Sequence, residues 1–162
     1  MTTCIYPMPE WLEESKKLYD STFEKKLKKI SGHYAYRIKA EPAWGIDKDL
    51  FQCSIMDAGK LIELKFYTEE EAQKDADFIM VASAPVWKNI LTKADKFVAA
   101  FMSRRIKLEK GNPVKALALG PYAGTMVASL TQVELIFPDD LSPEDLEKFK
   151  VSFAEYREKA GV

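Results

Sequence analysis

The sequence predicts a single α+β domain, and three observations lead to this prediction. Short segments in which apolar and polar residues alternate, typical of half-buried strands, follow one another through residues 34–66. Segments with apolar residues at three- and four-residue intervals, typical of amphipathic helices, lie over residues 10–30 and 143–160. The chain has 162 residues, the size of one domain and enough to build a full core without disulfides or metals.

The first helix is expected over residues 10–30, with lysines and glutamates opposite its apolar stripe. Pro9 precedes this helix, and Ser31-Gly32 is a plausible end. The apolar stripe consists of Trp11, Leu12, Leu18, Tyr19, Phe23, Leu27 and Ile30.

Three strands should then form an antiparallel meander, because they are sequential, short and closely linked. They are expected over residues 34–39, 51–55 and 62–66. The segment Pro42–Lys48 is a connection, and Asp57–Lys60 is a turn in which Gly59 tolerates a positive φ.

Two further strands are expected among short helices. Thr68 and Glu71 form a capping box that begins a helix ending near Lys74. Residues 78–82 are apolar on both faces, which indicates a strand covered on both sides. Helices should follow from Ser83 and over residues 97–102, and the last strand over residues 105–109.

The last third of the chain is expected to be mainly helical. Asn112 and Pro113 are a typical helix start, and Gly120-Pro121 interrupts that helix. Residues 126–137 fit either a helical stripe or a strand. The terminal helix over residues 143–160 begins with a Ser142 cap, an N1 proline and a Leu141–Leu146 staple.

The composition narrows the class of protein. Hydrophobic residues make up 47% and charged residues 30%, and the net charge of −1 gives no general attraction to nucleic acid. There is no apolar run of membrane-spanning length and no signal-peptide pattern, so we expect a cytoplasmic protein. Cys4, near a flexible start, and Cys53, in a strand, fit a reducing compartment.

The residues that would carry catalysis or hold a cofactor are sparse, so we predict a protein that is not an enzyme and needs no metal or cofactor. His33 is the single histidine, and the sequence shows no nucleophile or carboxylate partner for it. One histidine and two distant cysteines are too few for a zinc site. The acidic runs at Glu69–Glu71 and Glu144-Asp145 stand at helix starts, where the macrodipole favours negative charge.

From Asp77 to Leu119 the chain resembles the sterol carrier protein type-two family. The family pattern is an Asp-led strand, an apolar helix, a Phe-Met turn, a basic-apolar strand and a Gly-Asn helix start. Here these features are Asp77, the helix around Trp87, Phe101-Met102, residues 104–108 and Gly111-Asn112. The chain departs from the pattern where the family usually has glycine, at Arg104 and in the turn at 92–94.

The resemblance implies a five-stranded, mostly antiparallel sheet covered by helices mainly on one face, with an apolar tunnel between the layers. The tunnel would hold a sterol, a fatty acyl chain or a similar lipid. The segment after Gly120-Pro121 and the terminal helix are candidates for its gate. The side chains predicted to line it are Ile79, Val81, Trp87, Ile90, Leu91, Phe97, Phe101, Met102, Leu117 and Met126.

Two predictions concern partners other than a lipid. The basic residues Arg104, Arg105, Lys107 and Lys110 suit a solvated strand edge or a transient contact with a membrane surface. The alternative to a lipid carrier is an interaction or oligomerisation module with a filled core, including a homodimer.

Overall fold

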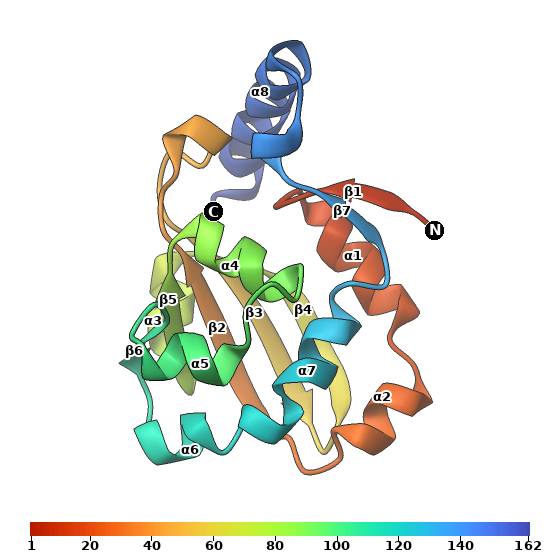
Figure 1. Cartoon of the computed structure of the whole chain (residues 1–162), viewed down its shortest axis with the longest axis vertical. Coiled ribbons are helices and arrows are strands. Elements are labelled where there is room, and N and C mark those ends of the chain that lie inside the picture. Colours follow the sequence, from red (N-terminus) through yellow and green to blue (C-terminus); the bar gives the residue numbers. More distant parts are fainter.

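The computed structural model describes residues 1–162 and contains a five-stranded sheet (Figure 1). The strands lie in the spatial order β4, β3, β2, β5, β6. Their bounds are Gly32–Ile38 for β2, Leu50–Asp57 for β3, Lys60–Tyr67 for β4, Phe78–Ala82 for β5 and Lys107–Lys110 for β6. Three of the four pairings are antiparallel, and β2 lies parallel to β5. The predicted α+β fold class with a mostly antiparallel sheet is therefore confirmed.

The turn between β3 and β4 depends on glycine. Gly59 has a φ of +85°, a conformation that costs glycine little. A Cβ atom at this position would also collide with the backbone of Glu24 and Leu27. The turn therefore combines a left-handed backbone with a close approach of the N-terminal segment. The predicted antiparallel meander of β2, β3 and β4 is confirmed.

Helices cover the sheet mainly on one face, as Figure 1 shows for α4, α5 and α7, whereas α3 lies behind the sheet. A larger core cluster fills the space on the first face, and a smaller one lies between the sheet and α3. None of the helices combines the length and apolar character needed to cross a membrane. The helix bounds are Pro9–Leu18 (α1), Ser21–Lys26 (α2), Glu69–Asp75 (α3), Ala84–Leu91 (α4), Phe97–Met102 (α5), Pro113–Leu117 (α6), Gly120–Ser129 (α7) and Pro143–Ala160 (α8), with 3₁₀ turns at Pro42–Trp44 (η1) and Pro138–Asp140 (η2).

The helix starts follow from local capping chemistry. The Thr68 hydroxyl accepts a hydrogen bond from the Glu71 amide at 3.1 Å, and the Glu71 carboxylate accepts one from the Thr68 amide at 2.9 Å. Asn112 and Ser142 cap α6 and α8 in the same way through their side-chain oxygens. These caps satisfy amides that have no partner inside the helix, so the predicted starts are confirmed.

The expectation of one helix over residues 10–30 is wrong. The chain forms α1 and α2 instead, with a break at Tyr19 and Asp20. Asp20 is extended, and its carboxylate accepts hydrogen bonds from the amides of Thr22 and Phe23. Because this carboxylate caps a new helix start, it competes with continuation of the first helix.

The N-terminal segment is also more ordered than expected. Thr3–Ile5 (β1) pairs in parallel with Glu134–Ile136 (β7) in a separate two-stranded sheet. Cys4, expected in a flexible start, is therefore buried, with 5% of its surface exposed. Residues 126–137, which fitted either a helix or a strand, contain parts of both, because α7 continues to Ser129 and β7 follows.

Candidate functional site

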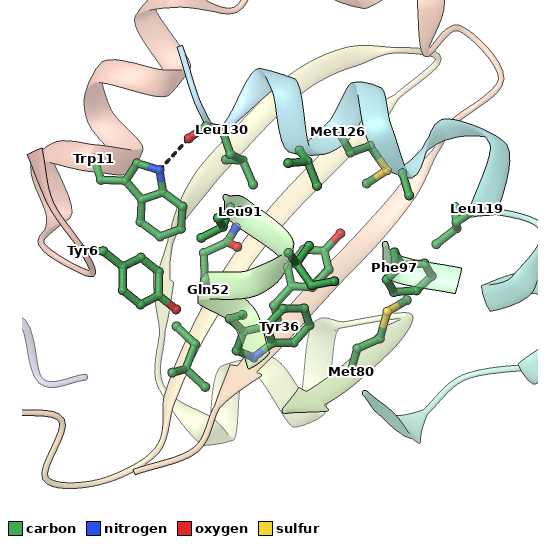
Figure 2. A pocket seen from close by; sticks show the side chains of 15 residues that line it. Tyr6, Trp11, Tyr36, Gln52, Met80, Leu91, Phe97, Leu119, Met126 and Leu130 are labelled. Atoms are coloured by element: carbon green, nitrogen blue, oxygen red, sulfur yellow. Dashed lines mark hydrogen bonds between the residues drawn. The ribbon is translucent and has the colours of Figure 1, made fainter. Parts of the chain in front are cut away.

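An apolar pocket lies between the helix-covered face of the sheet and the helices above it (Figure 2). Its floor comes from β2, β3 and β5, and its walls and roof come from α1, α4, α5 and α7. Fourteen of its fifteen lining residues are hydrophobic, which makes it suited to a ligand without charge. The lining residues are Tyr6, Trp11, Tyr36, Ile38, Gln52, Met80, Trp87, Ile90, Leu91, Phe97, Leu119, Ala123, Met126, Val127 and Leu130.

The pocket is narrow in this structure. The cavity volume is about 70 Å³, and the empty space including open solvent is about 650 Å³. An enclosed cavity of a few tens of Å³ admits only a few waters. The pocket is partly open to solvent, and the enclosed tunnel stays a prediction. Because the cavity is small, a long ligand requires a covering helix to move.

Strand alternation decides which sheet residues face the pocket. Tyr36 and Ile38 of β2, Gln52 of β3 and Met80 of β5 point to this side. Their immediate neighbours point to the opposite side, because successive residues of a strand alternate. Ala35, Phe51, Cys53 and Ile79 accordingly pack in the smaller cluster with Ala72 and Ala76.

The roof is built on helical periodicity. On α4, Trp87, Ile90 and Leu91 share one face, at the spacing of a helical stripe. Residues Ala123, Met126, Val127 and Leu130 repeat the same spacing along α7 and its C-cap. No residue of α8 lines the pocket, so the expectation of a gate now applies to α7 and not to the terminal helix.

Two tryptophans are held in place by hydrogen bonds at the pocket wall. The Trp11 Nε1–H donates to the Leu130 carbonyl at 2.8 Å, which ties α1 to the C-terminal end of α7 (Figure 2). The Trp87 Nε1–H donates to the Arg37 carbonyl at 3.0 Å, which ties α4 to β2. With their single donors satisfied, both indoles present apolar surface to the pocket.

The polar groups of the pocket are neutral. Burial raises the pKa of the Tyr6 and Tyr36 hydroxyls, so both keep their protons. Gln52 is 4% exposed, and its Nε2 atom has no hydrogen-bond partner. The pocket thus offers an uncharged surface with one unsatisfied amide.

A second, smaller cavity continues the apolar space beneath α7. It has about 370 Å³ of empty volume, including open solvent, and its lining includes Ser54, Met56 and Leu64. Tyr36, Met126 and Leu130 line both cavities. These three side chains therefore separate two parts of one apolar layer.

Five of the ten side chains predicted to line a tunnel line this pocket: Trp87, Ile90, Leu91, Phe97 and Met126. All five lie on helices, where the apolar stripe identifies the inner face. The role of these residues in ligand binding stays a prediction.

The other five predicted residues do not line the pocket. Ile79 packs in the opposite cluster, and strand alternation places Val81 on that side too. Phe101 packs against Phe97, with ring centroids 5.8 Å apart. Met102 and Leu117 are 66% and 39% exposed, because they end short helices on the outside of the molecule.

Sequence reasoning missed ten lining residues, which include strand residues, two residues of the N-terminal segment and one glutamine. Tyr36, Ile38 and Met80 carried a signal, since the alternation of β2 and β5 already divided their residues between two faces. Trp11 belongs to the apolar stripe predicted for the first helix, but nothing local places it or Tyr6 at the pocket, because a pairing with the distant β7 brings their segment there. Gln52 was missed because a polar residue was not expected on the covered face.

The two side chains with catalytic potential lie on the opposite face of the sheet. Burial, the main cause, raises the pKa of the Cys53 thiol to about 12, so it is a poor nucleophile at neutral pH. Burial also lowers the pKa of His33, whose Nε2 has no partner and whose ring meets the Tyr67 ring edge-on at 5.0 Å. Neither residue forms a nucleophile–base pair.

Comparison with known proteins gave matches to a family model and to solved structures. The sequence model of the SCP-2 sterol transfer family matches residues 12–123. A crystal structure of sterol carrier protein 2 is 21% identical, with a TM-score of 0.66 over 78% of this chain and 97% of that one. No curated protein matches the sequence.

Two further solved structures share the fold. A conserved hypothetical protein of Thermus thermophilus is 23% identical, with a TM-score of 0.66 over 80% of this chain and 90% of that one. The palmitated SCP2L2 of Aedes aegypti is 14% identical, with a TM-score of 0.50 over 72% of this chain and 95% of that one.

Proposed function

Because this chain belongs to the SCP-2 sterol transfer family, we propose that it binds a lipid-like molecule in the pocket beneath α7 and carries it unchanged. The observation that supports this most is the pocket itself, since fourteen of its fifteen lining residues are hydrophobic. A fatty acyl chain is the first ligand to test, given that one structure of this fold is the palmitated protein of Aedes aegypti.

Burial of an acyl chain supplies enough free energy for such binding. Each buried methylene group contributes about 0.8 kcal/mol, so about twelve to sixteen of them contribute roughly 10–13 kcal/mol before costs. Association costs at least about 4 kcal/mol. At that cost about 6–9 kcal/mol remains, which corresponds to a dissociation constant between roughly 40 μM and 0.3 μM, and it needs no catalytic residue.

Entry of the ligand requires α7 to move away from the sheet. α7 supplies Ala123, Met126 and Val127 to the roof of the pocket, and Met126 also separates the two cavities. Displacing this one helix would therefore join both cavities into a longer channel. The hydrogen bond from Trp11 to the Leu130 carbonyl would hold the C-terminal end of α7 in place, so this end would be the hinge of the movement.

A surface beside α7 suits contact with an anionic membrane during transfer. Val98 and Met102 on α5, and Val114 and Leu117 on α6, are among the exposed large hydrophobic side chains. A Cβ atom on Gly120 would lie 2.8 Å from Val98, so this surface adjoins the start of α7. Basic residues accompany it, namely Lys96, Arg104 and Lys115, while Arg105 of the expected basic cluster pairs with Asp95.

Native mass spectrometry of the purified chain tests the proposal. We expect an added mass of lipid size, and displacement of a fluorescent fatty acid by unlabelled palmitate. A chain that carries no guest and binds neither fatty acid would overturn the proposal. Light scattering then separates the alternative, because an interaction module with a filled core would form a stable oligomer and bind no lipid.

A further inference from the structure

Gln52 is a polar residue in an apolar environment. It lies on β3, opposite Tyr36 on β2 and Phe66 on β4, and so in the interior of the sheet. It is 4% exposed, and Figure 2 shows its amide directed into the pocket. Every other residue that lines the pocket is hydrophobic.

The Gln52 amide is not accounted for by the packing of the protein. Its Nε2 atom is buried and has no hydrogen-bond partner. A buried amide without a partner destabilises the folded state, whereas an apolar side chain of similar length would not. A hydrogen-bond acceptor supplied by a ligand would satisfy Nε2 and remove this cost when the ligand binds.

The charges around the pocket indicate what kind of acceptor fits. No charged residue lines the pocket. Arg37, the neighbour of Tyr36, alternates to the other face and is paired with Asp49 at 2.7 Å and Glu109 at 2.8 Å. A carboxylate buried beside Gln52 would lack a cation, and an unpaired buried charge is strongly unfavourable. A neutral oxygen carries no such cost.

We propose that Gln52 selects the ligand by donating a hydrogen bond from Nε2 to a neutral oxygen, either a carbonyl or a hydroxyl, within an otherwise apolar lipid. This proposal rests on the proposed function and adds the class of ligand to it. The apolar parts of the lipid occupy the pocket and the cavity that adjoins it beneath α7. A free fatty acid would keep its carboxylate at the solvent opening, away from Gln52.

The test compares ligands that differ at one oxygen. Methyl tetradecyl ketone, hexadecanol, palmitate and hexadecane compete with a bound fluorescent fatty acid on the full chain. In Gln52→Met, which keeps the length of the side chain and removes the amide, we expect affinity for the ketone and the alcohol to fall about tenfold. Affinity for hexadecane should change by less than about twofold, which also shows that the variant folds.

Gln73→Met is the matched control, because it makes the same substitution on α3 behind the sheet, and Gln73 lines neither cavity. This variant should leave the ratio of ketone affinity to hexadecane affinity as it is in the native chain. The same ratio in Gln52→Met as in the native chain would overturn the role of Gln52, and so would a loss of affinity confined to palmitate. Binding of none of the probes to the native chain would instead overturn the proposed function.

Discussion

Replacing Ala123 by leucine decides whether the space beneath α7 receives a ligand or is unused core. Ala123 lines the pocket from α7. The substitution adds three carbon atoms, and we take each to displace about one methylene group of the ligand. Three groups at about 0.8 kcal/mol each remove about 2.4 kcal/mol of binding free energy, so the dissociation constant should rise about fiftyfold.

Displacement of a fluorescent fatty acid measures this change, and urea unfolding measures stability. Stability should stay within about 1 kcal/mol of the native chain, because the added carbons enter space that is now empty. Gly124→Leu is the control, since nothing lies within 4 Å of a Cβ atom at Gly124, and it should leave affinity unchanged. Equal affinity in Ala123→Leu and the native chain would refute the reasoning, as would an equal loss in both variants.

Three further outcomes are expected. Gly124→Ala should raise the free energy of unfolding by about 0.5–1 kcal/mol in urea titration, because alanine favours an exposed helix interior; an unchanged or lower value would contradict the exposed placement. Between pH 8 and pH 10 the free energy of unfolding of the native chain should fall by about 1.4 kcal/mol more than that of Cys53→Ala. The reason is that the pKa of the Cys53 thiol is about 12 in the folded chain and 9.0 in the unfolded chain, so only the unfolded thiol ionises in this range. Parallel pH profiles of the two proteins would exclude this linkage. Met102→Glu should weaken sedimentation with anionic phosphatidylserine vesicles about fivefold, whereas Val151→Glu, at a similarly exposed site on α8, should not; equal effects would remove α5 from the membrane contact.

Local signals in the sequence were reliable where the interaction itself is local. The capping box of Thr68 and Glu71 and the cap at Asn112 join atoms a few residues apart, so their pattern is sufficient to place α3 and α6. The same locality could have revealed the cap at Asp20 that divides α1 from α2. It was missed because the apolar stripe continues at helical spacing across the break.

The alternation of side chains along a strand explains two of the errors in the candidate site, Ile79 and Val81. Residues 78–82 are apolar on both faces, so the sequence contains no contrast that shows which residues face α4 and α7. The parallel register with β2 places Met80 beside Tyr36 and Ile79 beside Ala35. Met80 therefore lines the pocket, whereas Ile79 packs toward α3.

By itself the sequence determined the fold class, several helix starts and the pocket-lining residues of α4, because periodicity and capping depend on neighbours within a few positions. Only the tertiary structure decided that Tyr6 and Trp11 close one side of the pocket and that the Gln52 amide enters it. The pairing of β1 with β7 and the register of β3 join residues that are far apart along the chain. Such contacts are selected by the packing of the whole molecule, and a local pattern carries no record of them.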